Sequence, residues 1–122
     1  MKTKLKDKIE YRNKHGQLHQ EDEPAIIYSD GMQEYYQNGK LHRTDGPSRI
    51  YKNGTQHYHL NGELHRTDGP AVIFPDGSQM YYLNGQLHRT DGPAIIWANG
   101  YRSYYLNGKR FTKDEYENQT KR

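Results

Sequence analysis

Short apolar runs alternate with polar turns along almost the whole chain. Runs of β-branched, small and aromatic residues recur every 23 residues, at 25–28, 48–51, 71–74 and 94–97. Each is followed by an Asp-Gly or Asn-Gly pair and then by a second short run centred on two adjacent rings. Short runs bounded by such pairs are typical of β-strands joined by tight turns. The pattern therefore predicts an antiparallel β-meander.

A fixed period organises this meander. The sequence Leu-His-Arg-Thr-Asp-Gly-Pro begins at Leu41, Leu64 and Leu87, and a degenerate copy begins at Leu18. A period in this range is typical of repeat proteins, whose units stack side by side. We expect a basic arm or edge strand at 1–14, with a strand at Lys8–Arg12, then a repeat domain at 15–111 and a helical cap at 112–122. The expected repeats are 15–37, 38–60, 61–83, 84–106 and a partial copy at 107–111.

The predicted fold class is all-β, an elongated single antiparallel meander sheet of stacked hairpin repeats with about nine strands. One short helix is expected at the C-terminal end, from about Lys113 to Gln119. Thr112 and Glu115 have the spacing of a capping box, in which the two residues satisfy each other's backbone N–H groups. We expect Phe111 and Tyr116 to turn towards the sheet and to cover its last repeat.

The facing of the side chains follows if every Asp-Gly and Asn-Gly forms a two-residue type I′ turn. Val72 then lies opposite Tyr81, and Tyr82 lies opposite Leu87. One face becomes small and aliphatic, and the other carries a column of rings joined by Arg49 beside Tyr58. We predict partner binding by this column, with a purely structural role as the alternative. Its members are Tyr28, Tyr35, His42, Arg49, Tyr51, Tyr58, His65, Phe74, Tyr81, His88, Trp97 and Tyr104.

No residue pattern indicates catalysis, a metal or a cofactor. The recurring histidines fall on hairpins about 10 Å apart, too far for neighbours to share one ion. The recurring Arg and Asp of each Leu-His-Arg-Thr-Asp-Gly-Pro copy are predicted to be structural. Asp is expected to accept a hydrogen bond from the amide two residues on, and Arg to contact it. We therefore expect a protein that is not an enzyme and needs no cofactor.

Charge is distributed unevenly along the chain. The formal net charge is +3, but residues 15–106 carry seven basic and ten acidic side chains, so the repeat body is mildly acidic. There is no cysteine, and no apolar run suggests a signal peptide or a membrane helix. These features favour a cytoplasmic protein and disfavour nucleic acid lying along the repeats.

The run from Tyr82 to His88, Tyr-Leu-Asn-Gly-Gln-Leu-His, resembles the aromatic-x-Asn-Gly-Lys-x-His core of MORN repeats. The run from Asp30 to Leu41 is similar to the MORN-variant repeats of bacteria and phages. The resemblance covers about residues 8–111 and departs after each His, where Arg-Thr-Asp-Gly-Pro-Ala replaces Gly-x-Gly. It implies stacked hairpins in one curved sheet and a role in interaction or scaffolding.

The expected function is a non-catalytic repeat module that binds another protein through its sheet face or edge. A phage or bacterial inhibitor that occupies a target protein is the specific form of this hypothesis. Two alternatives stay open. One is recognition of a nucleic acid or nucleotide by the Tyr, His and Arg face through ring stacking. The other is binding to anionic lipids.

Overall fold

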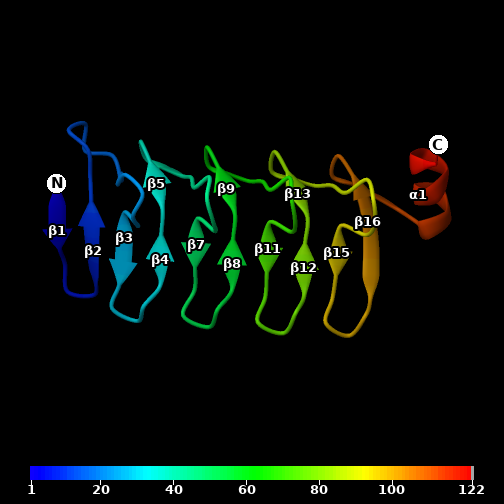
Figure 1. The fold of residues 1–122 in the computed structure, drawn as a ribbon, viewed down its shortest axis with the longest axis horizontal. Helices are drawn as coiled ribbons and strands as arrows, with labels where there is room; N and C mark the ends of the chain where they lie inside the picture. Colours follow the sequence, from blue (N-terminus) through cyan, green and yellow to red (C-terminus); the bar gives the residue numbers. More distant parts are fainter. Residues whose placement is uncertain (122) are drawn as a thin grey trace. The chain divides into compact units, whose positions relative to one another are not determined.

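An antiparallel β-meander forms the protein (Figure 1), as the sequence predicts. The structure is a computed structural model and describes residues 1–121. Eleven strands are hydrogen-bonded in the order β1-β2-β3-β4-β7-β8-β11-β12-β15-β16-β17, and three two-stranded ribbons branch from them. The strand number exceeds the expected nine partly because the second run breaks at Tyr35, Tyr58 and Tyr81 into a sheet strand and a ribbon strand, whereas the last run is the continuous β16. Among the described residues, no helix has the length and apolar character needed to cross a membrane.

Contacts divide the chain into two units, the first spanning Met1–Glu63 and the second beginning at Leu64. The strands of the first unit are β1 (Lys2–Lys4), β2 (Lys8–Tyr11), β3 (Ile26–Tyr28), β4 (Gln33–Glu34), β5 (Tyr36–Gln37), β6 (Lys40–Leu41), β7 (Arg49–Ile50), β8 (Gln56–His57) and β9 (His59–Leu60). The strand β10 (Glu63–Leu64) lies at the boundary. The second unit holds β11 (Val72–Ile73), β12 (Gln79–Met80), β13 (Tyr82–Leu83), β14 (Gln86–Leu87), β15 (Ile95–Ile96), β16 (Arg102–Leu106), β17 (Lys109–Phe111) and α1 (Lys113–Thr120).

The ribbon turns, which begin at Asn38, Asn61, Asn84 and Asn107, are the predicted type I′ turns. In the ribbon of β13 and β14, Tyr82 lies opposite Leu87 and Leu83 opposite Gln86. Asn84 and Gly85 both have positive φ, 50° and 80°. This combination gives the twist that joins two adjacent strands through only two residues. The register expected for the ribbons is confirmed.

The turns of the sheet hairpins, at Asp30-Gly31, Asn53-Gly54, Asp76-Gly77 and Asn99-Gly100, differ from the prediction by one residue. Val72 lies opposite Met80, not Tyr81, and Ile73 opposite Gln79. Phe74 accepts a hydrogen bond from Gly77 N at 3.0 Å and donates its own N–H to Ser78 O at 3.0 Å. The loop therefore has three residues, a type I turn followed by glycine at φ 94°. Proline at 75 favours this turn, because its fixed φ suits the first central position.

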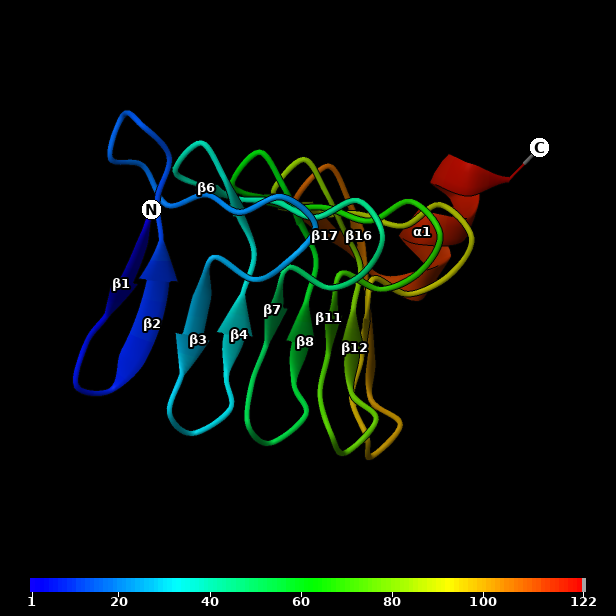
Figure 2. The ribbon, with the colours of Figure 1, turned by 60° about the vertical axis from the view of Figure 1, so that its left-hand side comes forward.

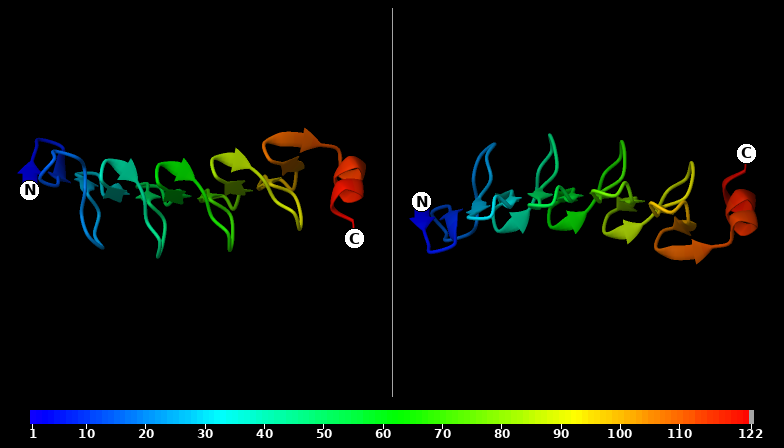
Figure 3. Two further views of the ribbon diagram at one scale, coloured as in Figure 1. Left: turned by 90° about the horizontal axis from the view of Figure 1, so that it is seen from above. Right: turned by 90° about the horizontal axis from the view of Figure 1, so that it is seen from below.

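The shifted register changes which side chains share a face. Positions equivalent to Val72, Phe74, Ser78 and Met80 lie together on one face, which we call the open face. The position of Tyr81 lies on the opposite side, from which the Arg-Thr-Asp-Gly-Pro loops project in each unit (Figure 3); we call this the loop face. The predicted single column of rings is therefore wrong. Since side chains alternate along a strand, a shift of one residue moves half of the column to the other face.

Burial is concentrated where each Arg-Thr-Asp-Gly-Pro loop returns to the sheet. The first residue after each proline is completely buried, and this residue is Ala25, Ser48, Ala71 or Ala94. The loop packs closely against the Arg43 side chain, since a Cβ added to Gly46 would lie 3.0 Å from the Cζ of Arg43. The glycine of the loop and the buried residue after its proline are accordingly both small. The core therefore consists of one small buried residue after each loop, repeated along the chain, and has no deep apolar centre.

The strand expected at Lys8–Arg12 is present as β2, and the capped helix is present at the other end, but the edge strand β1 was not predicted. The edge strand β1 pairs with β2, and its lysines are exposed. At the other end Thr112 and Glu115 form the capping box of α1. Tyr116 is 4% exposed, and its ring centroid lies 4.8 Å from that of Tyr104. The Tyr116 hydroxyl donates to the carbonyl of Arg89 and accepts from Gly92 N. The helix is thus held to the last complete loop by one buried ring.

The positive φ of Asn84 provides a direct test of the ribbon turns. Asn84→Ala should lower the free energy of unfolding by about 1 kcal/mol, because alanine tolerates the left-handed region poorly. Urea denaturation measures this difference. Gln86→Ala in the same ribbon is the control, since its side chain is exposed. Equal stability of the two variants would contradict the type I′ assignment.

Candidate functional site

Each Arg-Thr-Asp-Gly-Pro loop is folded back by its own arginine. In the first unit the Cζ of Arg43 stands 3.9 Å from the ring centroid of Tyr35. Its Nε donates to Asp45 Oδ1 at 3.0 Å and its Nη1 to Pro47 O at 3.1 Å. One guanidinium therefore makes a cation–π contact, an ion pair and a backbone hydrogen bond.

The second unit repeats this arrangement with Arg89. Its Cζ lies 4.0 Å from the Tyr81 ring centroid, and it donates to Asp91 at 2.9 Å and to Pro93 O at 3.1 Å. The predicted structural role for the Arg and Asp pair agrees with these contacts. The predicted amide contact of the Asp is wrong, because the residue two positions on is proline and has no N–H. The Asp of the hairpin turns makes that contact instead, as Asp76 does with Ser78 N at 2.9 Å.

A groove lies between successive loops on the loop face of each unit. Figure 2 shows the course of these loops along the backbone. In the first unit a cavity of about 230 Å³ is lined by the loop residues Glu21 and Asp22, by the next loop, and by Tyr35 and His42 between them. In the second unit a cavity of about 430 Å³ has Tyr81 and His88 in the same positions. The same groove thus occurs in both units.

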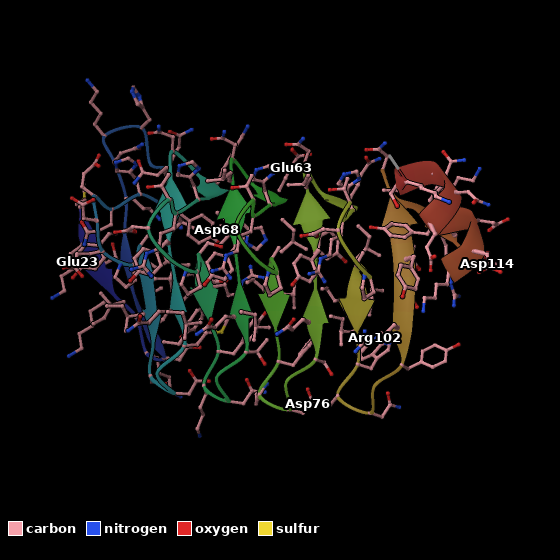
Figure 4. All side chains as sticks on the ribbon, turned by 45° about the vertical axis from the view of Figure 1, so that its right-hand side comes forward. Glu23, Glu63, Asp68, Asp76, Arg102 and Asp114 are labelled. Atoms are coloured by element: carbon pink, nitrogen blue, oxygen red, sulfur yellow. The ribbon has the colours of Figure 1, made fainter. Side chains whose placement is uncertain are left out.

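The rims of these grooves are acidic. The side chains of Asp45 and Asp91 are 77% and 81% exposed, although each accepts one hydrogen bond from an arginine. Glu21, Asp22 and Glu23 extend this character at the degenerate first loop, where no arginine is present. Figure 4 labels Glu23 and Asp68 on such loops. The loop face therefore favours a ligand with basic groups.

The histidines of the repeat join neighbouring hairpins. His88 N donates to Tyr81 O at 3.0 Å, which confirms that the two residues are paired. The Nδ1 of His88 accepts from Asn107 N at 2.9 Å, and His42 and His19 accept from the equivalent Asn N–H groups. An accepting Nδ1 leaves the proton on Nε2, so this contact requires the neutral ring. Within residues 1–121 no three His, Asp or Glu side chains are grouped as a metal site.

The open face of the first unit carries a row in which four of five side chains are ionisable. Glu10, Ile26, Glu34, Arg49 and His57 lie opposite one another in turn across β2, β3, β4, β7 and β8. Glu10 is 8% exposed and lies 3.1 Å from both Lys8 Nζ and Arg12 Nη2. The hydrogen bond from Lys8 holds the pKa of Glu10 below its ordinary value. Two buried carboxylates thus lie in one row, which the predicted register did not bring together.

Glu34 is the centre of this row and is 4% exposed. Its Oε2 accepts from Arg49 Nε at 2.7 Å, and its Oε1 accepts from the Tyr28 hydroxyl at 2.7 Å. Burial, followed by the hydrogen bond to Glu34, raises the pKa of Tyr28. The expected position of Arg49 beside Tyr58 is wrong, because His57 lies opposite it in the shifted register. Arg49 forms a partly buried ion pair with Glu34.

A second histidine, His59, lies beside the end of the row, with its ring centroid 6.1 Å from that of His57. His59 is 7% exposed, and its Nδ1 lies 2.7 Å from Ser48 Oγ. Burial, with a smaller contribution from Arg49, lowers the pKa of His59 to about 4 and also lowers the pKa of His57. The Ser48–His59 pair has the spacing of a nucleophile and its base, but Ser48 is completely buried and also contacts His57 O at 3.0 Å. Ser48 cannot reach a substrate in this arrangement.

The same row is uncharged in the second unit. Val72, Met80, Ile95 and Ser103 occupy it across β11, β12, β15 and β16. Comparison of the repeats shows this difference in the sequence itself, since Glu34 and His57 stand where the later repeats have Met80 and Ser103. Arg49 was recognised as unusual from the sequence. Glu34 was missed, because the assumed turn placed it on the other face.

The predicted binding residues therefore separate into three groups. Tyr28, Arg49, Tyr51, Phe74 and Trp97 belong to open-face positions, whereas Tyr35, His42, Tyr81 and His88 line the two loop-face grooves. Tyr58 and His65 occupy the same repeat positions as the groove Tyr and His, and His65 Nδ1 accepts from Asn84 N at 2.9 Å. Tyr104 packs against Tyr116 of α1. Residues missed by the prediction are Glu21, Asp22 and the loop Asp side chains.

Comparison with protein-family models, with curated proteins and with solved structures finds no match for this chain. The case for a function therefore depends on the geometry and charge of its own surfaces.

The buried histidines predict a specific dependence of stability on pH. His59 titrates at about 4 when folded and at about 6.5 when unfolded, so the unfolded chain binds the proton more tightly. The free energy of unfolding should be highest above about pH 6.5 and should fall as the pH drops from about 6.5 to 4. Urea denaturation at a series of pH values measures this change.

A matched variant identifies the residue responsible. Tyrosine occupies the position of His59 in the other three repeats, for example at Tyr36 and Tyr82. His59→Tyr should therefore flatten the stability profile between pH 6.5 and 4, whereas His15→Gln, at an exposed turn, should leave it unchanged. An identical slope in His59→Tyr and the parent protein would refute the assignment.

Proposed function

We propose that the protein is a non-catalytic, protein-binding repeat module whose loop face contacts its partner. The observation that carries this proposal is the recurrence of one groove, with the same Tyr and His and the same acidic rim, in both units. A groove that recurs at the same repeat position suits an extended surface of a macromolecule, which can contact several copies.

The groove side chains are already ordered by contacts within the chain. Arg43 and Arg89 are each held by three contacts, and His42 and His88 are held through Nδ1. Side chains fixed before binding lose little further conformational entropy when a partner arrives. Tyr and Arg are also the residue types enriched among the strongest contacts of protein interfaces.

Charge defines the chemistry of the partner. The exposed carboxylates on the rims, such as Asp45 and Asp91, favour a surface or segment rich in Lys and Arg. The same carboxylates repel phosphates, which argues against nucleic acid and anionic lipid as ligands of this face. The resemblance to MORN-type repeats supports an interaction role in general terms. The specific form of the proposal is a phage or bacterial inhibitor, which would block its target protein if it bound the active surface of that target.

The test compares partner capture by variants of the grooves. Thr44→Arg and Thr90→Arg place a large basic side chain at an exposed position in each groove, and together they should lower the affinity for the captured partner by at least about tenfold. Ala98→Arg adds the same side chain at an exposed hairpin turn and is the control. Pull-down followed by titration with the purified partner gives the affinities.

The contribution of the acidic rims is measured by the salt dependence of the affinity in the same experiment. The affinity of the parent protein should weaken as the salt concentration rises, because rim charges contribute to encounter and binding. If Thr44→Arg with Thr90→Arg bound the partner as tightly as Ala98→Arg, the loop face would not be the binding surface. Capture of nucleic acid instead of protein would also overturn the proposal.

A further inference from the structure

The last strand of the meander is paired along only part of its length. The strand β16 spans Arg102–Leu106, but β17 lies opposite only its last three residues, from Tyr104 onward. On the other side, β15 pairs with Arg102 and Ser103. Within residues 1–121 no strand lies beside Arg102 and Ser103 on the side away from β15, as the lower half of β16 in Figure 1 shows.

The backbone of Arg102 points towards this unpaired side. Trp97 N donates to Tyr101 O at 2.9 Å, so these two residues form a hydrogen-bonded pair of the antiparallel ladder. Hydrogen-bonded and non-hydrogen-bonded pairs alternate along such a ladder. Ile96 and Arg102 are therefore a non-hydrogen-bonded pair, and the N–H and C=O of Arg102 point away from β15. One repeat earlier, the equivalent Gln79 has Ile96 of the next hairpin on this side.

A cavity of about 410 Å³ lies along this edge. Arg102, Ser103 and Tyr104 of β16 line one wall, and residues 110–113 with Glu115 line the other. The helix α1 covers the upper part of the last repeat through Tyr116 and leaves the lower part of β16 open. Figure 4 labels Arg102 on β16 and Asp114 on α1 and shows the separation between them. The end of the sheet thus combines an unpaired backbone edge with a groove.

The groove is strongly basic. Arg102, Arg110 and Lys113 are exposed and make no ion pair with any residue in the described part of the chain. The carboxylate of Glu115, which also lines the groove, accepts a hydrogen bond from Thr112 N at 2.9 Å as part of the helix cap. The three cations therefore remain available to an acidic ligand. This is the opposite of the acidic rim on the loop face.

Backbone geometry and charge together specify the ligand. An unpaired strand edge binds extended polypeptide, whose amides continue the ladder, and nucleic acid offers no such groups. A second copy of the chain is disfavoured, because its own edge strand β1 carries Lys2 and Lys4 and would bring like charges together. An extended segment with acidic side chains matches both features of the site.

We propose that the open edge of β16 binds an extended acidic peptide segment of a partner protein by antiparallel strand addition. The segment pairs with the backbone of Arg102, and its carboxylates contact Arg110 and Lys113. Trp97 and Tyr101, which are 40% and 61% exposed, offer apolar surface on the same hairpin. This site is distinct from the loop-face grooves and would bind its segment independently of them.

A synthetic peptide with the sequence of residues 21–28 is a suitable probe, because three acidic residues precede a strand sequence of this repeat type. Binding can be followed through the fluorescence of Trp97, the only tryptophan of the chain. We expect saturable binding to the full chain. A peptide whose acidic residues are replaced by Gln and Asn should bind about tenfold more weakly.

Variants of exposed side chains test the basic groove without disturbing the sheet. Arg110→Gln combined with Lys113→Gln should weaken binding of the acidic peptide about fivefold. Lys52→Gln removes an exposed charge at a turn of the first unit and should have no effect. Thr44→Arg with Thr90→Arg, in the loop-face grooves, should also leave peptide binding unchanged. Failure of this proposal and failure of the loop-face proposal are therefore distinguishable.

The strand-addition geometry is tested with the peptide backbone itself. Only every second amide of an added strand faces β16, so N-methylation of one alternating set should abolish binding and N-methylation of the other should preserve most of it. Equal effects of the two sets would overturn strand addition. Undiminished binding to Arg110→Gln with Lys113→Gln, or of the uncharged peptide, would overturn the acidic specificity.

Two further outcomes assign the edge to another ligand. Concentration-dependent dimerisation that the peptide competes away, measured by analytical ultracentrifugation, would show that a second copy occupies this edge. Displacement of the peptide by an oligothymidine would show that the groove binds nucleic acid. Either result contradicts the proposal.

Discussion

The return of each loop onto the sheet through its arginine is the contact on which the repeat depends. The strands in each unit are mostly only two or three residues long, and strands so short provide few ladder hydrogen bonds. Arg43 adds a ring contact, an ion pair and a backbone hydrogen bond at one point, and it closes the loop over the buried Ser48. Gly46 is required there because a Cβ would crowd the guanidinium. Much of the surface and of the core is therefore set by one short sequence motif.

The histidine of the motif has a second task, which is to connect hairpins. Its Nδ1 accepts the N–H of the Asn that begins the next type I′ turn, as His88 does from Asn107. That N–H has no ladder partner of its own at the start of a tight turn, and an unpaired backbone donor is costly. The Leu-His-Arg-Thr-Asp-Gly-Pro motif, which combines residue types common in active sites, is thus explained by folding requirements alone. We expect function to depend on the surfaces outside these contacts, which are the acidic loop rims and the open edge of β16.

The sequence predicted the repeat, the meander, the capped helix and the type I′ turns, because each depends on local residue preferences. It did not predict the open-face row, because Asp76-Gly77 was assigned to a two-residue type I′ turn, whereas Asp76 does not have the positive φ that this turn needs and the loop has three residues. That difference reverses the facing of every residue beyond the turn. Pro75 was the available signal, since proline suits the first central residue of a type I turn. The acidic rims were missed because Asp45 and its equivalents were assigned to backbone contacts that the following proline cannot make.

The two faces differ in how freely the repeats can vary. Residues of the loop face support the loop, so Tyr35 and Tyr81 recur beneath Arg43 and Arg89. Open-face positions carry no such contact, and the position of Glu34 is His57, Met80 and Ser103 in the later repeats. Glu34 is nevertheless buried beside the half-buried Arg49, and removal of Arg49 would leave the Glu34 charge uncompensated. The pair therefore fixes which hairpins can be neighbours in the first unit, while the second unit uses apolar side chains in the same row. The repeats share one loop sequence, but their open faces differ. The open face therefore determines which repeat can lie next to which.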